Sequence, residues 1–477
     1  MTTSSTGEFD VIVLGAGPVG QVTADRARAA GLTVAVVERE LVGGECSYWG
    51  CVPSKAMLRP VIAVADARRV DGARQAVTGR IDPAGVFARR DHYTSDWDDT
   101  GQADGVRSLG AELVRGHARL DGERRVAVTT PDDRIVLLTA RLAVVVCTGS
   151  RATVPDLPGI AHARPWTNRA ATDSHDLPRR LAVVGAGPVG VEMATAWHGL
   201  GSAVTLLSRT RRLLPRMEPF VGDLVADGLR EAGIEVRTGV EVSELRRPAP
   251  SDPVTLVLDD DTTIVVDQVL FATGRTPNTD DIGLATVDLE PGSWLEADDS
   301  CQVAGDWLYA AGDVNHRALL THQGKYQARV IGNVLAARAG GTPLDRTPWS
   351  PHTATADNEA VPQVVFTDPE AASVGLTADQ AERAGYRVRA VDVDFGAAVM
   401  GARLYADGYT GRARMVVDLD REHLLGVTFV GPGVSELLSS ATIAVAAQVP
   451  IDRLWHAVPC FPTISEIWLR LLEAYRG

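Results

Sequence analysis

One six-residue motif, GAGPVG, occurs twice in this chain, and each copy stands between two strand-like apolar segments. The copies occupy Gly15–Gly20 and Gly185–Gly190. A helix-like stretch and a second apolar strand follow each copy, and these strands end at Glu38 and Ser208. In both copies the first glycine precedes that end residue by 23 positions, which is the length of one β-α-β dinucleotide-binding unit. The chain is therefore predicted to contain two such units.

The glycines of each copy have separate physical roles. The first makes a tight turn, the second lets a pyrophosphate approach the backbone, and the third lets the following helix pack on the strand. That helix points its N-terminus, which carries partial positive charge, at the phosphates. The expected cofactor-binding glycines are Gly15, Gly17 and Gly20 in the first copy and Gly185, Gly187 and Gly190 in the second.

The residue that ends the second strand of each unit indicates which nucleotide the unit binds. An acidic residue there hydrogen-bonds the adenosine ribose and excludes a 2′-phosphate, so Glu38 suits FAD. The second unit has Ser208 followed by Arg209. A guanidinium in place of a carboxylate favours the 2′-phosphate of NADP(H) over NAD(H). The alternative is that this arginine belongs to a solvated face of an arginine-rich chain.

Three further apolar strands run into turns of small residues, which is where an α/β sheet holds its ligands. The turns are Thr148-Gly149 after Leu142–Cys147, Gly274-Arg275 after Gln268–Phe271, and Gly312-Asp313 after Trp307–Ala311. From about Val361 onward strands precede helices, which is typical of a separate α+β domain. Its predicted strands are Gln363–Phe366, Arg387–Asp394, Arg412–Asp418 and Leu424–Val430, and its predicted helices are Ser435–Ala447 and Ser465–Tyr475.

Charge and hydropathy limit the partners of the chain. A net charge of −14 over 477 residues opposes non-specific binding to nucleic acid or to anionic membranes. No apolar run approaches the roughly 18 residues that a membrane span needs. The polar N-terminus does not read as a signal peptide, so we expect a cytoplasmic location. Of the 47 basic residues only two, Lys55 and Lys325, are lysines.

Two of the five cysteines, Cys46 and Cys51, are close in sequence and flanked by glycines. On an ideal α-helix residues five apart have Cα atoms about 8.6 Å from each other, whereas a disulfide tolerates about 7 Å. The pair can close only where the backbone departs from an ideal helix, and Gly43, Gly44 and Gly50 supply that freedom. Such a pair at a helix start is expected to have a lowered thiolate pKa and to cycle between dithiol and disulfide. The alternative is that Cys46 and Cys51 are two buried free cysteines. We expect Cys147 and Cys301, which stand alone, to be small core residues.

The segment Gly43–Lys55 reads GGECSYWGCVPSK, and with it the chain resembles the class I pyridine nucleotide–disulfide oxidoreductases. That family includes dihydrolipoamide dehydrogenase, glutathione reductase and mercuric reductase, and its hallmark is GGxCxxxxCxPSK. The resemblance covers nearly the whole chain. It includes ATGRTPN at Ala272–Asn278, YAAGD at Tyr309–Asp313 and VPQVVFTDPEAASVGLT at Val361–Thr377.

The resemblance implies a fold and a division into domains. The expected fold is α/β, with two Rossmann-like dinucleotide-binding domains and a C-terminal α+β dimerisation domain. The expected domains are residues 1–155 and 286–350 for FAD and the central part, 156–285 for NAD(P)H, and 351–477 for the interface. The family is homodimeric, and the partner's interface domain completes each active site.

The resemblance also implies roles for individual residues. Cys51 is the charge-transfer thiol against the flavin, and Cys46 is the interchange thiol that faces substrate. Lys55 pairs with Glu192 near flavin N5. Asp313 holds the FAD ribityl chain, and the helix that begins near Leu320, Thr321 and His322 faces the flavin N1/O2 edge. The remaining expected cofactor contacts are Gly44, Ala118, Thr148, Gly149, Gly312, Gly274 and Arg275. No metal site is expected.

The match fails at the family's catalytic base, a histidine in an HPTxSE motif. This chain has Phe461 in that position, and a phenylalanine side chain transfers no proton. Glu466, the expected catalytic partner of that histidine, remains. His456 is a substitute base in one reading, and Cys460 is expected to be a packed thiol rather than a third redox centre.

The substrate side is also unusual. Tyr48 and Trp49 lie between the paired cysteines and either line the approach to Cys46 or pack against the interface domain. The absence of the family's base disfavours lipoamide and glutathione as substrates. The chain also ends without the cysteine pair of mercuric reductase, which disfavours mercuric ion. The leading hypothesis is electron flow from NADPH through FAD and the Cys46–Cys51 pair to an unidentified, apolar small-molecule disulfide. The alternatives are a dithiol oxidase, a quinone or metal-ion reductase, and a non-enzymatic redox sensor.

Overall fold

The computed structural model describes residues 3–477, which form two compact units. The first contains residues up to Pro53 with Asp91–Arg151 and Arg275–Asn358, and the second contains Ser54–Arg90, Ala152–Gly274 and Glu359–Gly477. The change from the first unit to the second between Pro53 and Ser54 falls inside helix α3 (Cys51–Arg68).

The first unit is built on a mainly parallel sheet. Its path runs β16-β17-β6-β1-β2-β3, with β4 and β5 attached beyond β6. Strand β1 has β2 on one side and β6 on the other, and both pairs are parallel. The order therefore reverses at β1, and in such sheets ligands bind at the carboxyl ends of the strands on either side of that point. The strands are β1 (Thr3–Leu14), β2 (Val34–Glu38), β3 (Glu112–Arg115), β4 (His117–Leu120), β5 (Arg125–Thr129), β6 (Ile135–Val146), β16 (Gln302–Ala304) and β17 (Leu308–Ala310).

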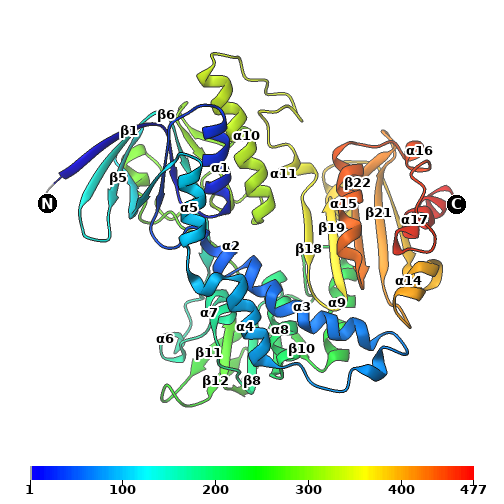
Figure 1. Ribbon diagram of the computed structural model, residues 1–477. Coiled ribbons are helices and arrows are strands. Elements are labelled where there is room, and N and C mark those ends of the chain that lie inside the picture. Colours follow the sequence, from blue (N-terminus) through cyan, green and yellow to red (C-terminus); the bar gives the residue numbers. More distant parts are fainter. Residues whose placement is uncertain (1–2) are drawn as a thin grey trace. The chain divides into compact units, whose positions relative to one another are not determined.

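Helices α1 (Pro18–Ala29) and α10 (Thr321–Ala339) pack against each other in this unit (Figure 1). Their buried side chains share one apolar core with those of β1, β2 and β6. All five residues of β2 are buried, as expected of a strand covered on both faces. The other helices of the unit are α2 (Gly44–Tyr48), α5 (Thr100–Ser108) and α11 (Ala356–Glu359).

The second unit repeats the strand–glycine loop–helix–strand arrangement. A four-stranded parallel sheet has the order β10-β9-β8-β14, and a three-stranded antiparallel sheet has the order β11-β12-β13. The elements of this part are β8 (Arg180–Val184), α8 (Pro188–Leu200), β9 (Ala203–Ser208), α9 (Pro219–Ala232), β10 (Glu235–Thr238), β11 (Val242–Arg246), β12 (Val254–Leu258), β13 (Thr263–Val266), β14 (Gln268–Phe271), α6 (Ile160–Ala163) and α7 (Asn168–Asp173).

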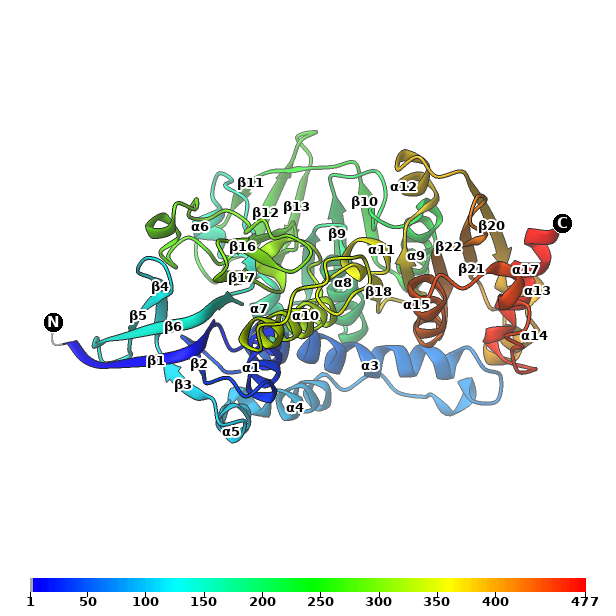
Figure 2. The same ribbon diagram turned by 90° about the horizontal axis from the view of Figure 1, so that it is seen from above.

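The C-terminal part of the second unit is a five-stranded antiparallel sheet, β18-β19-β22-β21-β20, flanked by helices (Figure 2). Helix α15 packs on β19 and β22, and α17 packs on β20 and β21. The strands are β18 (Pro362–Val365), β19 (Glu370–Gly375), β20 (Val388–Asp394), β21 (Arg412–Asp418) and β22 (His423–Gly431). The helices are α12 (Ala378–Arg383), α13 (Phe395–Ala398), α14 (Met400–Tyr405), α15 (Leu438–Ala446), α16 (Ile451–Leu454) and α17 (Ile467–Arg476). The predicted α+β architecture is confirmed.

The compact units divide the chain differently from the predicted domains. Residues 54–90, which include most of α3 and most of α4 (Pro83–Tyr93), belong to the second unit because Met57 and Phe87 lie in one apolar core with Trp197 of α8. The C-terminal sheet belongs to the same unit. Its Arg414 donates to the buried carboxylate of Glu218 at 2.8 Å, just before α9.

No helix among residues 3–477 combines the length and the apolar composition that crossing a membrane requires.

Candidate redox-active site

The first glycine loop has the geometry that a pyrophosphate requires. Gly15 has φ +100°, and a Cβ atom there would lie 2.5 Å from the carbonyl oxygen of Cys147. A Cβ on Gly20 would lie 1.9 Å from the carbonyl oxygen of Gly15, so helix α1 packs against the loop only with glycine at this position. A Cβ on Gly17 would meet no atom within 4 Å. The middle glycine therefore faces open space, where the phosphates bind in such loops.

The second loop repeats this pattern. Gly185 has φ +134°, and a Cβ there would lie 2.2 Å from the carbonyl oxygen of Ala272. A Cβ on Gly190 would lie 2.1 Å from the carbonyl oxygen of Gly185, whereas one on Gly187 would meet nothing within 4 Å. In both units the backbone of the middle glycine is thus open to the close approach that a pyrophosphate makes in such loops.

The carboxylate of Glu38 lies beside the first loop. It is buried and accepts hydrogen bonds from the backbone N–H groups of Ala16 at 2.7 Å and Glu40 at 2.8 Å. Burial raises the pKa of Glu38, although these hydrogen bonds oppose the shift. Each carboxylate oxygen has a second lone pair, so the residue retains the acceptor capacity that binding a ribose needs.

Four predicted FAD contacts lie just after β6 and β17 or within β4. The hydroxyl of Thr148 is buried and has no hydrogen-bond partner, and Gly149 has φ +69° with open space at its Cβ position. Gly312, with φ +81°, donates its backbone N–H to Gln327 of α10 at 2.7 Å. Ala118 pairs with Val128 between β4 and β5. The buried, unpaired hydroxyl and the open glycine fit a bound polar cofactor.

Asp313 is held by two neighbours. Its Oδ2 accepts from the Ser150 hydroxyl at 2.5 Å, and the Arg275 guanidinium lies 3.6 Å away. Arg275 donates Nε to the Ser150 hydroxyl and Nη2 to the Ser150 carbonyl at 2.7 Å. The structure therefore places Arg275 with the Asp313 turn. Gly274 has φ +149°.

The two cysteines lie on either side of a helix break. Cys46 is in α2, and Cys51 is the first residue of α3. Trp49, at the C-terminus of α2, has φ −137°, so the backbone departs from the ideal helix as predicted. Cys51 is exposed and Cys46 is half-buried. The Cys51 sulfur lies 3.3 Å from the hydroxyl of Thr321, the first residue of α10.

The predicted lowering of the thiolate pKa is wrong for Cys46. A hydrogen bond to Cys51, burial, and repulsion from Cys51 together raise the pKa of Cys46 far above that of an ordinary thiol. Two adjacent thiols cannot both ionise easily, so they share one proton. The hydrogen bond to Cys51 and burial therefore favour the thiol form of Cys46. Thr321 and Lys325 act in the opposite direction and lower the pKa of Cys46.

The predicted pairing of Lys55 and Glu192 is present in the second unit. The Lys55 ammonium lies 2.6 Å from Glu192 Oε2, and Glu192 is buried. The other carboxylate oxygen accepts from the backbone N–H of Phe366 at 3.0 Å. The Phe366 ring lies 5.1 Å from the ammonium. These contacts hold the lysine in one place, while its role at the flavin remains a prediction.

At the end of β9, Ser208 is buried and its hydroxyl donates to the carbonyl oxygen of Thr210 at 3.0 Å. Arg209 is 79% exposed on its side chain, and its nearest carboxylate is that of Glu241 at 3.6 Å. A guanidinium held this loosely can turn toward a phosphate at low cost.

Tyr48 and Trp49 do not line an approach to Cys46, because both are buried. The Tyr48 hydroxyl donates to the carbonyl oxygen of Val42 at 3.2 Å and accepts from Gln102 of α5 at 3.2 Å. Tyr48 is therefore a packed residue, but its partners belong to the first unit and not to the interface domain. Gln102, which the sequence did not suggest as a site residue, also accepts a hydrogen bond from Gln21 of α1.

The segment in place of the family's base has exposed side chains at Phe461 and His456 and a buried carboxylate at Glu466. Phe461 is 73% exposed, and His456 is also exposed. Glu466 is buried, and its carboxylate accepts from the backbone N–H of Gly401 at 3.1 Å, so its observed role is to hold α14. Cys460 is exposed rather than packed, contrary to expectation. Cys147 and Cys301 are core residues as predicted.

Two predicted residues begin α10. Leu320 is its N-cap, and no side chain caps the helix. His322 is exposed one residue beyond Thr321. The partial positive charge at the start of this 19-residue helix can therefore act on an anion or on a polar cofactor edge.

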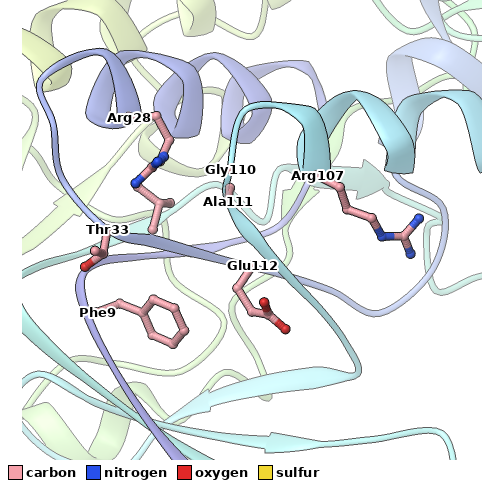
Figure 3. Close-up of a pocket in the computed structure, with 8 residues that line it drawn as sticks. Phe9, Arg28, Thr33, Arg107, Gly110, Ala111 and Glu112 are labelled. Atoms are coloured by element: carbon pink, nitrogen blue, oxygen red, sulfur yellow. The ribbon is translucent and has the colours of Figure 1, made fainter.

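A hollow of about 410 Å³ lies elsewhere in the first unit, and Figure 3 shows side chains that line it. Val34 and Glu112, which line it, are the first residues of β2 and β3, so it lies at the amino ends of the strands. Arg28 in its wall donates to the backbone carbonyls of Leu109 and Leu32. These contacts give the arginine a structural role. Among residues 3–477 no three His, Cys, Asp or Glu side chains lie together in a way that could hold a metal ion.

Residues 9–341 match the pyridine nucleotide-disulphide oxidoreductase family, and residues 361–471 match its dimerisation domain. The chain belongs to this family. It is 30% identical to a mercuric reductase of Staphylococcus aureus over 96% of this chain and 81% of the relative. It is 32% identical to dihydrolipoyl dehydrogenase 2 of Haloarcula marismortui over 98% of this chain and 97% of the relative. A solved structure, the Cu(II) complex of the HOCl-induced flavoprotein disulfide reductase RclA from Escherichia coli, has the same fold. Its TM-score is 0.83 at 22% identity, over 98% of this chain and 99% of that one.

Like other pyridine nucleotide-disulphide oxidoreductases, the protein is an enzyme of a family that uses FAD and a pyridine nucleotide. The two glycine loops and the residues around Asp313 fit these cofactors. Lys325, whose charge lowers the pKa of Cys46, is a residue that the motifs did not indicate. Its one sequence signal is rarity, because it is one of only two lysines.

Proposed function

We propose that this enzyme reduces a small-molecule disulfide with NADPH, passing electrons through FAD and the Cys46–Cys51 pair. The observation that supports this best is the thiol pair itself, with Cys46 donating toward an exposed Cys51 that contacts the start of α10. The balanced reaction consumes NADPH, one proton and the substrate disulfide, and forms NADP⁺ and two thiols. FAD, when bound, supplies the step between hydride and thiols.

Each residue of the pair has a distinct part in this proposal. A sulfur of the substrate forms a mixed disulfide with Cys46 while the first product thiol leaves. Cys51 then attacks the Cys46 sulfur, which releases the second thiol and forms the Cys46–Cys51 disulfide. The hydroxyl of Thr321 and the N-terminus of α10 stabilise negative charge on Cys51. Phe461, an exposed aromatic side chain where the family has histidine, favours an apolar substrate.

Turnover measurements test this function. Oxygen-free assays with NADPH and an aromatic disulfide are expected to give two thiols for each NADPH consumed. The same assays with Cu(II) or a quinone measure the competing activities. Consumption of NADPH with those acceptors alone, and no thiol from any disulfide, would reject disulfide reduction as the function.

Reduction of a metal ion is the second candidate. An exposed thiol beside a half-buried one presents soft ligands to a metal ion such as copper, and such a reaction requires no acid or base at Phe461. RclA, which has the same fold, is described in a Cu(II) complex. Reduction of Cu(II) that survives Cys46→Ser would separate direct flavin chemistry from a route through the thiols.

We propose NADPH as the preferred reductant because Ser208 replaces an acidic residue and the Arg209 guanidinium is exposed. Arg209→Glu is expected to move the preference toward NADH, since the carboxylate repels a 2′-phosphate and can accept from a ribose hydroxyl. The measurement is kcat/KM for flavin reduction by each nucleotide. An equal or higher kcat/KM for NADH in the wild type would reverse the assignment.

We also propose that the enzyme is a homodimer, as its dimerisation domain indicates for the family. Large apolar side chains are exposed on the C-terminal part of the chain, including Leu404, Ile443, Val458 and Phe461. Burying them between two copies would remove this apolar area from water. Sedimentation at micromolar concentration is expected to give twice the mass of one chain, and a monomer would exclude completion of the site by a partner.

A further inference from the structure

We propose that Lys325 is the cation that stabilises the thiolate of the reduced Cys46–Cys51 pair. Lys325 is a positioning residue that acts on charge at the sulfurs. The inference rests on the proposed function, because it concerns the dithiol formed in that cycle. It extends that function by naming what lets a thiolate form although Phe461 accepts no proton.

The first support is the register of α10. The hydroxyl of Thr321 lies 3.3 Å from the Cys51 sulfur, and Lys325 follows Thr321 by four residues on the same helix. Residues four apart lie on one face of an α-helix, and their side chains lean toward its N-terminus. The Lys325 side chain therefore extends from the face of α10 that carries the thiol contact.

The second support is that the Lys325 ammonium is not neutralised. Among residues 3–477 no carboxylate lies within ion-pair distance of it. Lys325 is half-buried, and partial burial strengthens the attraction of a cation for a nearby anion relative to water. The thiol pair contacts the same face of α10, through Thr321.

Charged groups on the neighbouring elements have other contacts. Asp357 of α11 pairs with Arg317 and accepts from Gln323 and Gln327 of α10. On α1, Arg26 pairs with Asp25, and Arg28 donates to backbone carbonyls. Glu45 lies 3.9 Å from Arg275, and Asp313 contacts Ser150 and Arg275. The side chains of His316 and His322 are exposed.

The electrostatic effect has the sign that the proposal requires. The charge of Lys325 lowers the pKa of Cys46 and thus opposes the increase caused by Cys51 and burial. The effect needs only a positive charge near the sulfurs, which an ammonium on a flexible four-carbon stem supplies. The chain uses lysine at only two of its 47 basic positions.

The test measures thiolate formation without relying on turnover. Reduced holoenzyme is alkylated with iodoacetamide between pH 5 and 9, and mass spectrometry gives the rate at Cys46 and at Cys51. Lys325→Met removes a positive charge from the helix face that contacts the pair. The apparent pKa of the pair is expected to rise by about one unit, which corresponds to roughly tenfold less thiolate at neutral pH. Lys325→Arg is expected to keep the wild-type profile.

Arg329→Met is the matched control, because it removes one positive charge from the same helix one turn further from Thr321. An unchanged profile in Lys325→Met would overturn the inference, and so would an equal shift in Arg329→Met. A loss in Lys325→Arg as large as in Lys325→Met would assign the effect to packing and also overturn it. Since alkylation needs no substrate, a failure of the proposed function appears separately, as NADPH turnover without disulfide reduction.

Discussion

Cys46→Ser is expected to abolish disulfide reduction while leaving reduction of the flavin by NADPH intact. The substrate forms its mixed disulfide with Cys46 in the proposed cycle, and a serine hydroxyl cannot replace that sulfur. Turnover with a disulfide should fall by about three orders of magnitude or more, to the background rate. Stopped-flow reduction by NADPH and steady-state thiol release measure the two halves of the reaction.

Cys51→Ser gives the complementary result. Two-electron reduction of the wild type is expected to produce a long-wavelength absorption band from the Cys51 thiolate beside the flavin. The variant should keep FAD and lose the band, because a serine hydroxyl does not ionise near neutral pH. Cys460→Ser is the matched control, since Cys460 is an exposed thiol outside the pair. Reduction of the wild type without this band would show that the pair is wrongly assigned.

Phe461→His is expected to raise activity toward dihydrolipoamide by tenfold or more. Positioned acid–base catalysis contributes roughly 10²–10⁴ in rate, and the wild type lacks the family's proton carrier at this position. The gain should stay below the full range because Glu466, the expected orienting partner, is engaged with the backbone of Gly401. Phe461 is exposed, so the substitution leaves the core unchanged.

The measurement is kcat/KM with dihydrolipoamide across pH, beside the rate of flavin reduction by NADPH, which should not change. Phe461→Leu is the control that alters side-chain size without adding a base, and no gain is expected from it. Strong lipoamide activity in the wild type would contradict the missing-base explanation and direct attention to Glu466, His456 or a bound water.

Much of the fold followed from local chemistry in the sequence. The duplicated GAGPVG loops were predicted correctly because each glycine is required by contacts within its own β-α-β unit, where a Cβ on Gly15 or Gly20 would strike nearby backbone. The strand Gln268–Phe271 was predicted with its exact bounds. The predicted helix break between Cys46 and Cys51 is also local, and so is the replacement of histidine by Phe461.

Other properties depend on segments that meet only in the folded chain. Tyr48 is buried because Gln102, distant in sequence, lies over it. The pKa of Cys46 rises through its hydrogen bond to Cys51 and through burial, and the spacing of the two residues in sequence shows neither. Thr321, 270 residues from Cys51, contacts its sulfur, and Lys325 of the same helix lowers the pKa of Cys46. The sequence by itself thus determined the elements and the reactive residue types. Tertiary packing decided which charges and hydrogen bonds surround them, because electrostatic energies depend on distances in space and on exclusion of water.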